Sequence, residues 1–218
     1  MNKSPSSPSP RPAKTSPVSE CVPLAWYTDH PNWGDSLNPI LVEWLAGKPV
    51  RKVDIGDGDC YIAVGSILWM ADSRTEVWGS GFMYEEDTLP VPPKRIHAVR
   101  GPLTRELLLR QNIECQEVYG DPALLLPLFD DPKVDPRYQV GLIPHLLDKD
   151  HPWIEKQRQV PGTLVIDVQS DVREFVRAVK SCRTVLSSSL HGLICADAYG
   201  VPNAWLKLSG QLPGGDFK

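Results

Sequence analysis

Short apolar runs alternate with helix-like segments from residue 22 onward, and this alternation constrains the fold more than any other feature. Glycine and proline bound most of the runs, as is typical of strands and helices joined by tight turns. Strands that alternate with helices favour parallel α/β units over a β-sandwich. We expect strands at residues 24–27, 61–64, 77–78, 96–99, 117–119, 139–143, 164–168, 184–186 and 204–206, and helices near 36–45, 102–111, 172–180 and 193–199.

A polar stretch with three prolines, PLFDDPKVDPRY at residues 127–138, divides this pattern in two. Composition of this kind is common between domains. We therefore predict two Rossmann-like domains, an N-terminal one over residues 22–130 and a C-terminal one over residues 131–218. The second half holds fewer elements than a doubly wound domain usually has, so we expect that domain to be truncated at its C-terminus.

Residues 1–21 form a separate Ser/Pro-rich segment. Of the chain's 22 prolines, five fall within residues 1–20, which carry few apolar side chains. Such a segment cannot bury enough surface to offset its ordering entropy, so we predict a disordered tail that is either a dispensable extension or a docking arm. It also lacks the apolar core of a secretory signal peptide.

Charge and cysteine usage exclude several classes of protein. A net charge of -4 and a pI near 5.7 argue against a general nucleic-acid binder. No apolar run reaches the roughly 18 residues that a membrane span needs. The five cysteines are widely spaced and form no CxxC pair, which indicates a reducing, cytoplasmic location.

Motifs for common cofactors are absent as well. The chain has no GxGxxG, Walker A, GxSxG or HExxH sequence and no zinc spacing, so we expect neither a bound metal nor a resident cofactor. Asp57 and Asp59 match the DxD pattern of metal-dependent glycosyltransferases. They precede a strand rather than follow one, so a Gly/Asp turn explains them better.

The most informative stretch is TVLSSSLHGLICADAYGVP at residues 184–202. A strand runs into three serines and then into a helix, at the sheet edge where α/β proteins bind ligands. The free N–H groups and positive dipole of the helix N-terminus suit an anion there. The candidate residues are Ser188, Ser189, Leu190, His191 and Gly192. The alternative is that the serines cap the helix and His191 is a structural histidine.

Arg100 ends another predicted strand, directly before Gly101 and Pro102 at the start of a helix. Its guanidinium would project near the same sheet edge, where it could clamp a phosphate or carboxylate in bidentate fashion. We therefore assign Arg100 to the site together with His191.

Further polar candidates follow other strands. Asn32 and Trp33 could offer a polar and stacking edge to a sugar, and Asp35 caps the next helix or binds the acceptor. Asp121 and His145 stand at strand ends in the first and second halves. Each is weak evidence alone, but together they place polar groups from both halves at one edge.

Seven segments resemble the polysaccharide pyruvyl transferase family, in particular the bacterial exopolysaccharide ketal-pyruvate transferases. They occur in family order across residues 24–206, and the ordered set is a specific signal. The segments are NWGDSLNP (32–39), VGSI (64–67), VWGSGF (77–82), VRGPLTR (99–105), GDPALLLP (120–127), GLIPH (141–145) and SSSLHGLICADAYGVP (187–202).

The resemblance implies a two-domain fold similar to the B-type glycosyltransferases, with phosphoenolpyruvate in the interdomain cleft. It implies transfer of the pyruvyl group to two hydroxyls of one sugar, which forms a cyclic ketal and releases phosphate. His191 of the Leu-His-Gly motif would be the general acid, and Arg100 would hold the anion. Some members have arginine immediately before that motif, whereas this chain has Ser189.

The implied partners are phosphoenolpyruvate and a saccharide acceptor in exopolysaccharide or other cell-surface polysaccharide synthesis. A lipid-linked acceptor would bring the protein to the inner face of the membrane. Two alternatives stay open at this point. One is a nucleotide-sugar glycosyltransferase of the same architecture, and the other is a non-catalytic, truncated saccharide-binding remnant.

Overall fold

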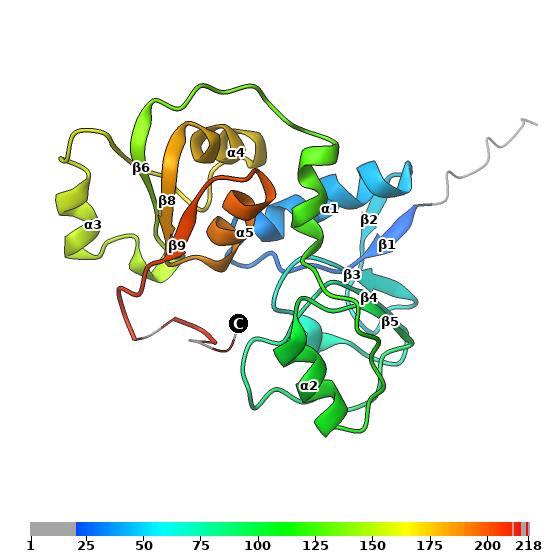
Figure 1. The fold of residues 1–218 in the computed structure, drawn as a ribbon. Helices are drawn as coiled ribbons and strands as arrows, with labels where there is room; N and C mark the ends of the chain where they lie inside the picture. Colours follow the sequence, from blue (N-terminus) through cyan, green and yellow to red (C-terminus); the bar gives the residue numbers. More distant parts are fainter. Residues whose placement is uncertain (1–20, 211, 215–216, 218) are drawn as a thin grey trace, which may run out of the picture.

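The first half of the chain forms a five-stranded parallel sheet, in the order β2-β1-β3-β4-β5 (Figure 1). The computed structural model describes residues 21–210, 212–214 and 217, so residues 1–20 of the predicted disordered tail lie outside the described residues. The strands of this sheet are β1 Val22–Leu24, β2 Val50–Lys52, β3 Cys60–Ile62, β4 Thr75–Trp78 and β5 Arg95–Ala98.

The second half forms a four-stranded sheet in the order β7-β6-β8-β9. Every strand pairing in both sheets is parallel, which confirms the predicted α/β class. The expected strand at residues 117–119 is reduced to one bridge between Val99 and Tyr119. The strands of the second sheet are β6 Tyr138–Ile143, β7 Thr163–Val165, β8 Cys182–Ser187 and β9 Asn203–Trp205.

The helices are α1 Trp33–Ala46, α2 Pro102–Arg110, α3 Pro152–Gln157, α4 Val172–Lys180 and α5 Leu190–Ala198, and the short 3₁₀ helices are η1 Leu68–Met70, η2 Pro122–Leu128 and η3 Leu146–Asp148. The predicted helix at 172–180 matches α4. The helix expected at 193–199 begins earlier, so the histidine of the Leu-His-Gly motif lies in the first turn of α5. Six-residue α3 and three-residue β2 were not predicted, because elements this short show almost no periodicity.

Helix α4 shows how the sequence specifies its packing. The Asp171 side chain accepts hydrogen bonds from Arg173 N and Glu174 N and so caps the first turn. Apolar residues then recur with the three- and four-residue spacing that places them on one face. That face is buried in the core and consists of Val172, Phe175, Val176 and Val179.

Helix α1 belongs by sequence to the first half but packs against helices of the second. Figure 1 shows α1 beside α5, on the side of the molecule that carries the second sheet. Trp33, Leu37 and Leu41 of α1 share one buried cluster with Phe175 and Val176 of α4. The two sheets therefore separate on either side of residue 131, while one buried cluster combines residues of α1 with residues of the second half. The domain boundary itself stays a prediction.

Trp33 is the centre of this junction. Its side chain is 0% exposed, and its ring stacks on Phe175 with centroids 5.2 Å apart. The indole Nε1 donates to Val172 O at 3.1 Å, and the backbone N of Trp33 donates to Val168 O at 2.7 Å. The expectation that Trp33 offers a stacking edge to a sugar is therefore wrong for this structure, because its ring is enclosed by the core.

Two further expectations concern thiols and membranes. Cys60, Cys115, Cys182 and Cys195 are buried free thiols, which fits the expected reducing location. Among the helices of the described residues, none combines the length and apolar character of a membrane span.

Replacing Trp33 should destabilise the whole protein rather than one half. We expect Trp33→Ala to lower the free energy of unfolding by about 3 to 5 kcal/mol, because the substitution leaves a cavity and removes a buried hydrogen bond between the two halves. Chemical denaturation followed by circular dichroism measures this loss. Trp205→Ala is the matched control, since Trp205 is 46% exposed. Equal effects of the two substitutions would contradict the assigned role of Trp33.

Candidate active site

A cavity of about 350 Å³ lies between the two halves of the protein, and the loops that follow strands of both sheets line it. Its walls thus consist of the carboxyl edges of both parallel sheets, the usual position of ligands in α/β proteins. Six predicted site residues line this cavity: Asn32, Asp35, His145, Ser189, Leu190 and His191. The other five are not among the lining residues: Trp33, Arg100, Asp121, Ser188 and Gly192.

The turn between β8 and α5 is held tightly by its own side chains. Ser187 Oγ accepts a hydrogen bond from Ser189 N at 3.0 Å. Ser188 Oγ accepts from His145 N at 2.8 Å, which joins this turn to the loop after β6. A Cβ atom at Gly192 would lie 2.3 Å from Ser187 Oγ, so only glycine fits there. Ser188 and Gly192 therefore shape the site from behind the cavity wall.

His191 lies against the first turn of α1. The side chain is 8% exposed, and its ring is edge-on to Trp33 with centroids 6.5 Å apart. A Cβ atom at Gly34 would lie 2.3 Å from both Cε1 and Nε2 of His191. The glycine of the NWGD segment thus provides the space in which the imidazole of the Leu-His-Gly segment lies.

Two helix N-termini open at the cavity, and they differ in charge. Asn32 caps α1, where Asp35 Oδ2 accepts from Asn32 N at 3.1 Å and from Asn32 Nδ2 at 2.6 Å. The first turn of α5 holds no acidic side chain. Because a carboxylate already occupies the positive end of α1, the end of α5 around Ser189 and His191 is the better position for an anion.

Arg100 does not line the cavity but contacts a residue that does. Its Nη1 donates to Ser66 Oγ at 2.6 Å, and Ser66 lines the cavity. Its Nη2 donates to Phe82 O at 2.8 Å, and a Cβ at Gly81 would lie 2.7 Å from Arg100 Cζ. Burial lowers the pKa of the guanidinium. In this structure Arg100 therefore contacts the cavity wall through Ser66 and does not line the cavity itself, as a direct clamp would.

Asp121 is a buried carboxyl whose pKa is affected by the charge of this arginine. The carboxyl is 4% exposed and caps η2, where its Oδ1 accepts from Ala123 N at 3.0 Å. Burial raises the pKa of Asp121 to about 6, although the hydrogen bond from Ala123 and the charge of Arg100 lower it. An acceptor-binding role is not supported in this structure, because the carboxyl is enclosed behind the wall.

Sequence reasoning missed several residues of the site. Asn38 is fully buried, and its amide donates to Val64 O and accepts from Val64 N, both at 3.0 Å, which joins α1 to the end of β3. The sequence does carry a signal for the role of Asn38, namely an asparagine on the face of a helix that is otherwise apolar. Tyr27, Trp69 and Tyr84 also line the cavity, Trp69 from the short helix η1 and the two tyrosines from loops that follow strands.

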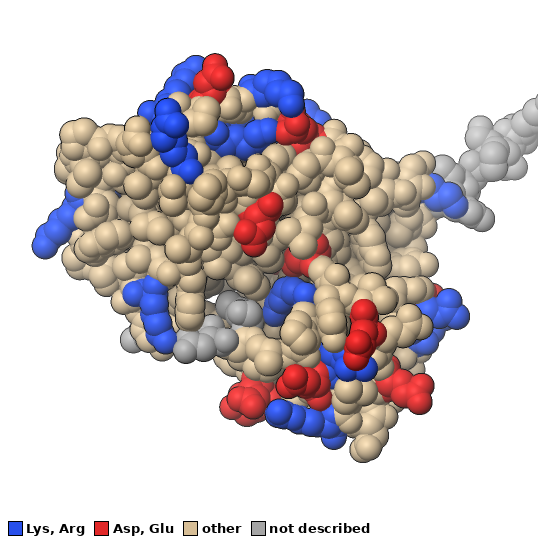
Figure 2. Space-filling view, in the orientation of Figure 1, with Lys and Arg blue, Asp and Glu red and all other residues tan. Residues whose placement is uncertain are grey.

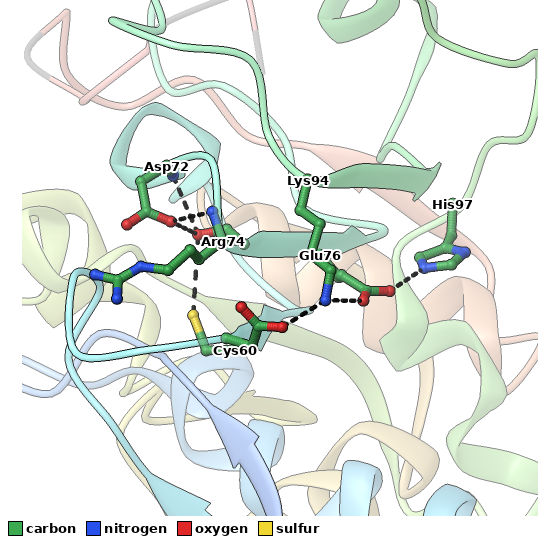
Figure 3. A network of polar contacts seen from close by, with 8 residues as sticks. Cys60, Asp72, Arg74, Glu76, Lys94 and His97 are labelled. Carbon is green, nitrogen blue, oxygen red and sulfur yellow. Dashed lines mark hydrogen bonds and ion pairs between the residues drawn. The ribbon is translucent and has the colours of Figure 1, made fainter.

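A separate polar network lies at strands β3, β4 and β5, away from the cavity (Figure 3). Glu76 Oε2 is 2.8 Å from His97 Nε2, and Lys94 Nζ is 2.6 Å from Asp59 Oδ2. The hydrogen bond from His97, followed by that from Lys94, lowers the pKa of Glu76. His97 is therefore paired with Glu76 in this structure, and Asp59 of the DxD sequence pairs with a lysine.

Charge on the surface does not mark the cavity. Figure 2 shows Lys and Arg gathered at the top of the face in view, over α4 and the connection before β6. There Lys180 pairs with Asp131, and Arg173 Nε lies 3.4 Å from Asp130 Oδ2. Within the described part of the chain, no three His, Cys, Asp or Glu side chains gather in a way that could hold a metal ion.

Comparisons with known proteins identify the group to which these features belong. The family model described as "Polysaccharide pyruvyl transferase" matches residues 32–209. The chain is 30% identical over 201 residues to an uncharacterized protein of Acanthamoeba polyphaga mimivirus, covering 86% of this chain and 68% of that protein. It is 29% identical over 198 residues to "Succinoglycan biosynthesis protein ExoV" of Rhizobium meliloti (strain 1021), covering 86% of this chain and 59% of that protein. No solved structure matches the chain significantly, so the likeness to B-type glycosyltransferases stays a prediction.

The contact between Gly34 and His191 can be tested by adding one methyl group. We expect Gly34→Ala to displace the imidazole and to cost about 1 to 3 kcal/mol of stability, because a Cβ cannot fit against the ring. The chemical shifts of the His191 ring and the denaturation midpoint measure both effects. Gly101→Ala serves as control, since a Cβ at Gly101 meets nothing within 4 Å. An unmoved His191 ring in Gly34→Ala would contradict this packing.

The raised pKa of Asp121 predicts a specific dependence of stability on pH. Between about pH 4 and pH 6 the unfolded chain loses the Asp121 proton while the folded chain keeps it, so this group's contribution to stability falls as pH rises. Asp121→Asn removes that contribution and keeps an oxygen for the cap. The stability of the variant relative to wild type should therefore rise over this window, by up to about 3 kcal/mol, and level off above it. A difference that stays constant with pH would contradict the raised pKa.

Proposed function

The chain belongs to the polysaccharide pyruvyl transferase family, and from this premise we propose that it transfers the pyruvyl group of phosphoenolpyruvate to two hydroxyls of one saccharide. The product is a cyclic ketal, and the leaving group is phosphate. The name of the Rhizobium relative supports a place in exopolysaccharide synthesis.

One observation carries the proposal: the N-terminus of α5, whose first turn contains His191 and no acidic side chain, opens into the cavity. A donor with a phosphate and a carboxylate needs N–H groups and positive charge, and this helix end supplies both. Arg100 adds positive charge behind Ser66, 2.6 Å from the serine oxygen. The Ser66 hydroxyl, polarised by this hydrogen bond from Arg100, would donate to an anion in the cavity.

The proposed reaction begins with proton transfer from His191 to C3 of the enol, which leaves an oxocarbenium-like centre at C2. One sugar hydroxyl adds to C2 and loses its proton. The second hydroxyl then displaces phosphate at the same carbon, which closes the ketal ring. Two hydroxyl protons are released overall: one restores His191, and the other leaves with the phosphate. Ser189 and the N–H groups around it would stabilise the phosphate as its charge increases.

His145 and Asn32 line the same cavity and are proposed to contact substrate. The proposed acceptor is a saccharide, either free or lipid-linked, and a lipid-linked acceptor would place the reaction at the inner face of the membrane. The proposed location is the cytoplasm, and the only donor required is phosphoenolpyruvate, with no resident cofactor.

Removing the imidazole should stop turnover without unfolding the protein. We expect His191→Ala to lower the rate of phosphate release from phosphoenolpyruvate by at least about 100-fold, the usual contribution of a positioned acid. Phosphate release in the presence of methyl β-D-galactopyranoside measures this rate. His97→Gln is the control, because His97 lies on β5 in the network of Figure 3. Near-normal turnover by His191→Ala would exclude the assignment of His191 as the acid.

Ligand-induced thermal stabilisation separates this proposal from its alternatives. Phosphoenolpyruvate should raise the melting temperature, and uridine or guanosine diphosphate sugars should not. Stabilisation by a nucleotide sugar alone would favour a glycosyltransferase. Stabilisation by neither ligand would favour a non-catalytic saccharide-binding protein.

A further inference from the structure

Three aromatic side chains of the first half line the cavity, and more than a third of each is exposed. Tyr27, Trp69 and Tyr84 are 37%, 48% and 45% exposed, and we name them the aromatic wall. Exposed rings that share one concave site indicate an interaction surface, because rings grouped in a cavity can bury apolar area against one ligand together. The wall replaces Trp33, whose ring is enclosed, as the aromatic part of the site.

Each ring of the aromatic wall follows a different strand, and fixed backbone supports at least two of them. Trp69 lies in η1, which Leu68 anchors through a fully buried side chain and through a bond from its N to Gly81 O at 3.1 Å. Tyr84 lies in a loop tied by Asp87, whose Oδ2 accepts from Tyr84 N at 2.9 Å. The rings are therefore attached to positions that are ordered before a ligand binds, which reduces the entropic cost of binding.

The two walls of the cavity differ in chemistry. The second-half wall holds the α5 N-terminus, Ser189 and His191, which suit an anion. Among the described residues that line the cavity there is no lysine or arginine, so the aromatic wall offers no cation to a second anionic group. It offers ring faces and two tyrosine hydroxyls. A neutral ligand with an apolar face and many hydroxyls fits this surface best.

We propose that the aromatic wall binds the acceptor saccharide, with a sugar ring stacked on Trp69 and its hydroxyls within reach of the tyrosines. This inference rests on the proposed function. It assigns the donor to the α5 side of the cavity and the acceptor to the opposite side, so that two sugar hydroxyls face C2 of the pyruvyl group. Trp69 is accordingly a residue that determines acceptor affinity and not donor affinity.

The test compares Trp69→Ala and Trp69→Phe with wild type, using methyl β-D-galactopyranoside as acceptor. Trp69→Ala should raise the acceptor KM about tenfold, which corresponds to the loss of one stacking contact, and should leave the KM for phosphoenolpyruvate unchanged. Trp69→Phe should recover most of the lost affinity. Trp205→Ala is the matched control, because Trp205 has the same residue type, is 46% exposed, and lies on β9 rather than among the lining residues.

Saccharide binding is also measured without turnover, by saturation-transfer NMR on methyl glycosides of galactose, glucose and mannose. Signal transfer to at least one glycoside that is lost in Trp69→Ala and kept in Trp205→Ala supports the aromatic wall even if phosphoenolpyruvate is not a substrate. Normal thermal stabilisation by phosphoenolpyruvate together with an unchanged acceptor KM in Trp69→Ala would overturn the inference and leave the proposed function standing. Absence of glycoside binding by wild type would also overturn the inference. So would a Trp69→Ala variant that loses binding of uridine diphosphate instead of binding of the glycoside.

Discussion

The packing of the first turn of α1 between the two sheets is the interaction on which the site depends. Trp33 joins α1 to the second half of the chain by stacking on Phe175 and by donating to Val172 O. Gly34, the next residue, leaves the space that His191 occupies. Because one helical turn both holds the halves together and supports the imidazole, the position of His191 relative to the first sheet is set by the core of the protein.

This arrangement also separates the charges of the site. Asp35 neutralises the N-terminus of α1, whereas the N-terminus of α5 keeps its positive character for a ligand. Asp121 is buried close enough to Arg100 for the arginine's charge to lower its pKa, and Arg100 contacts the cavity wall through the hydroxyl of Ser66. The cavity thus has one side formed by the N-terminus of α5 and one side of aromatic rings, an arrangement that suits the proposed reaction of an anionic donor with a neutral sugar.

The fold class could be predicted from the sequence because alternating apolar runs and helical patterns are local signals. Residues 172–180 show this best, since an Asp cap and four regularly spaced apolar positions indicate α4 without any information on tertiary contacts. The ordered motifs also predicted the family, which the comparison over residues 32–209 confirms. His191, Ser189 and Asn32 were found because each follows a strand at the sheet edge where ligands bind in α/β proteins.

Trp33 and Asp121 were assigned wrongly because their burial arises from long-range packing. A tryptophan beside a turn glycine suggests exposure, but Gly34 is required by a histidine 157 positions later in the chain. Trp69 and Tyr84 were missed for the opposite reason, since an exposed aromatic in a loop or in a three-residue 3₁₀ helix leaves no periodic pattern to detect.

The most direct test of the account is a crystal structure of the protein soaked with phosphoenolpyruvate. We expect the phosphate and carboxylate to contact backbone N–H groups of the first turn of α5, with the His191 imidazole beside C3 of the enol. Binding of phosphoenolpyruvate outside the cavity, or against the aromatic wall with α5 uncontacted, would contradict the account.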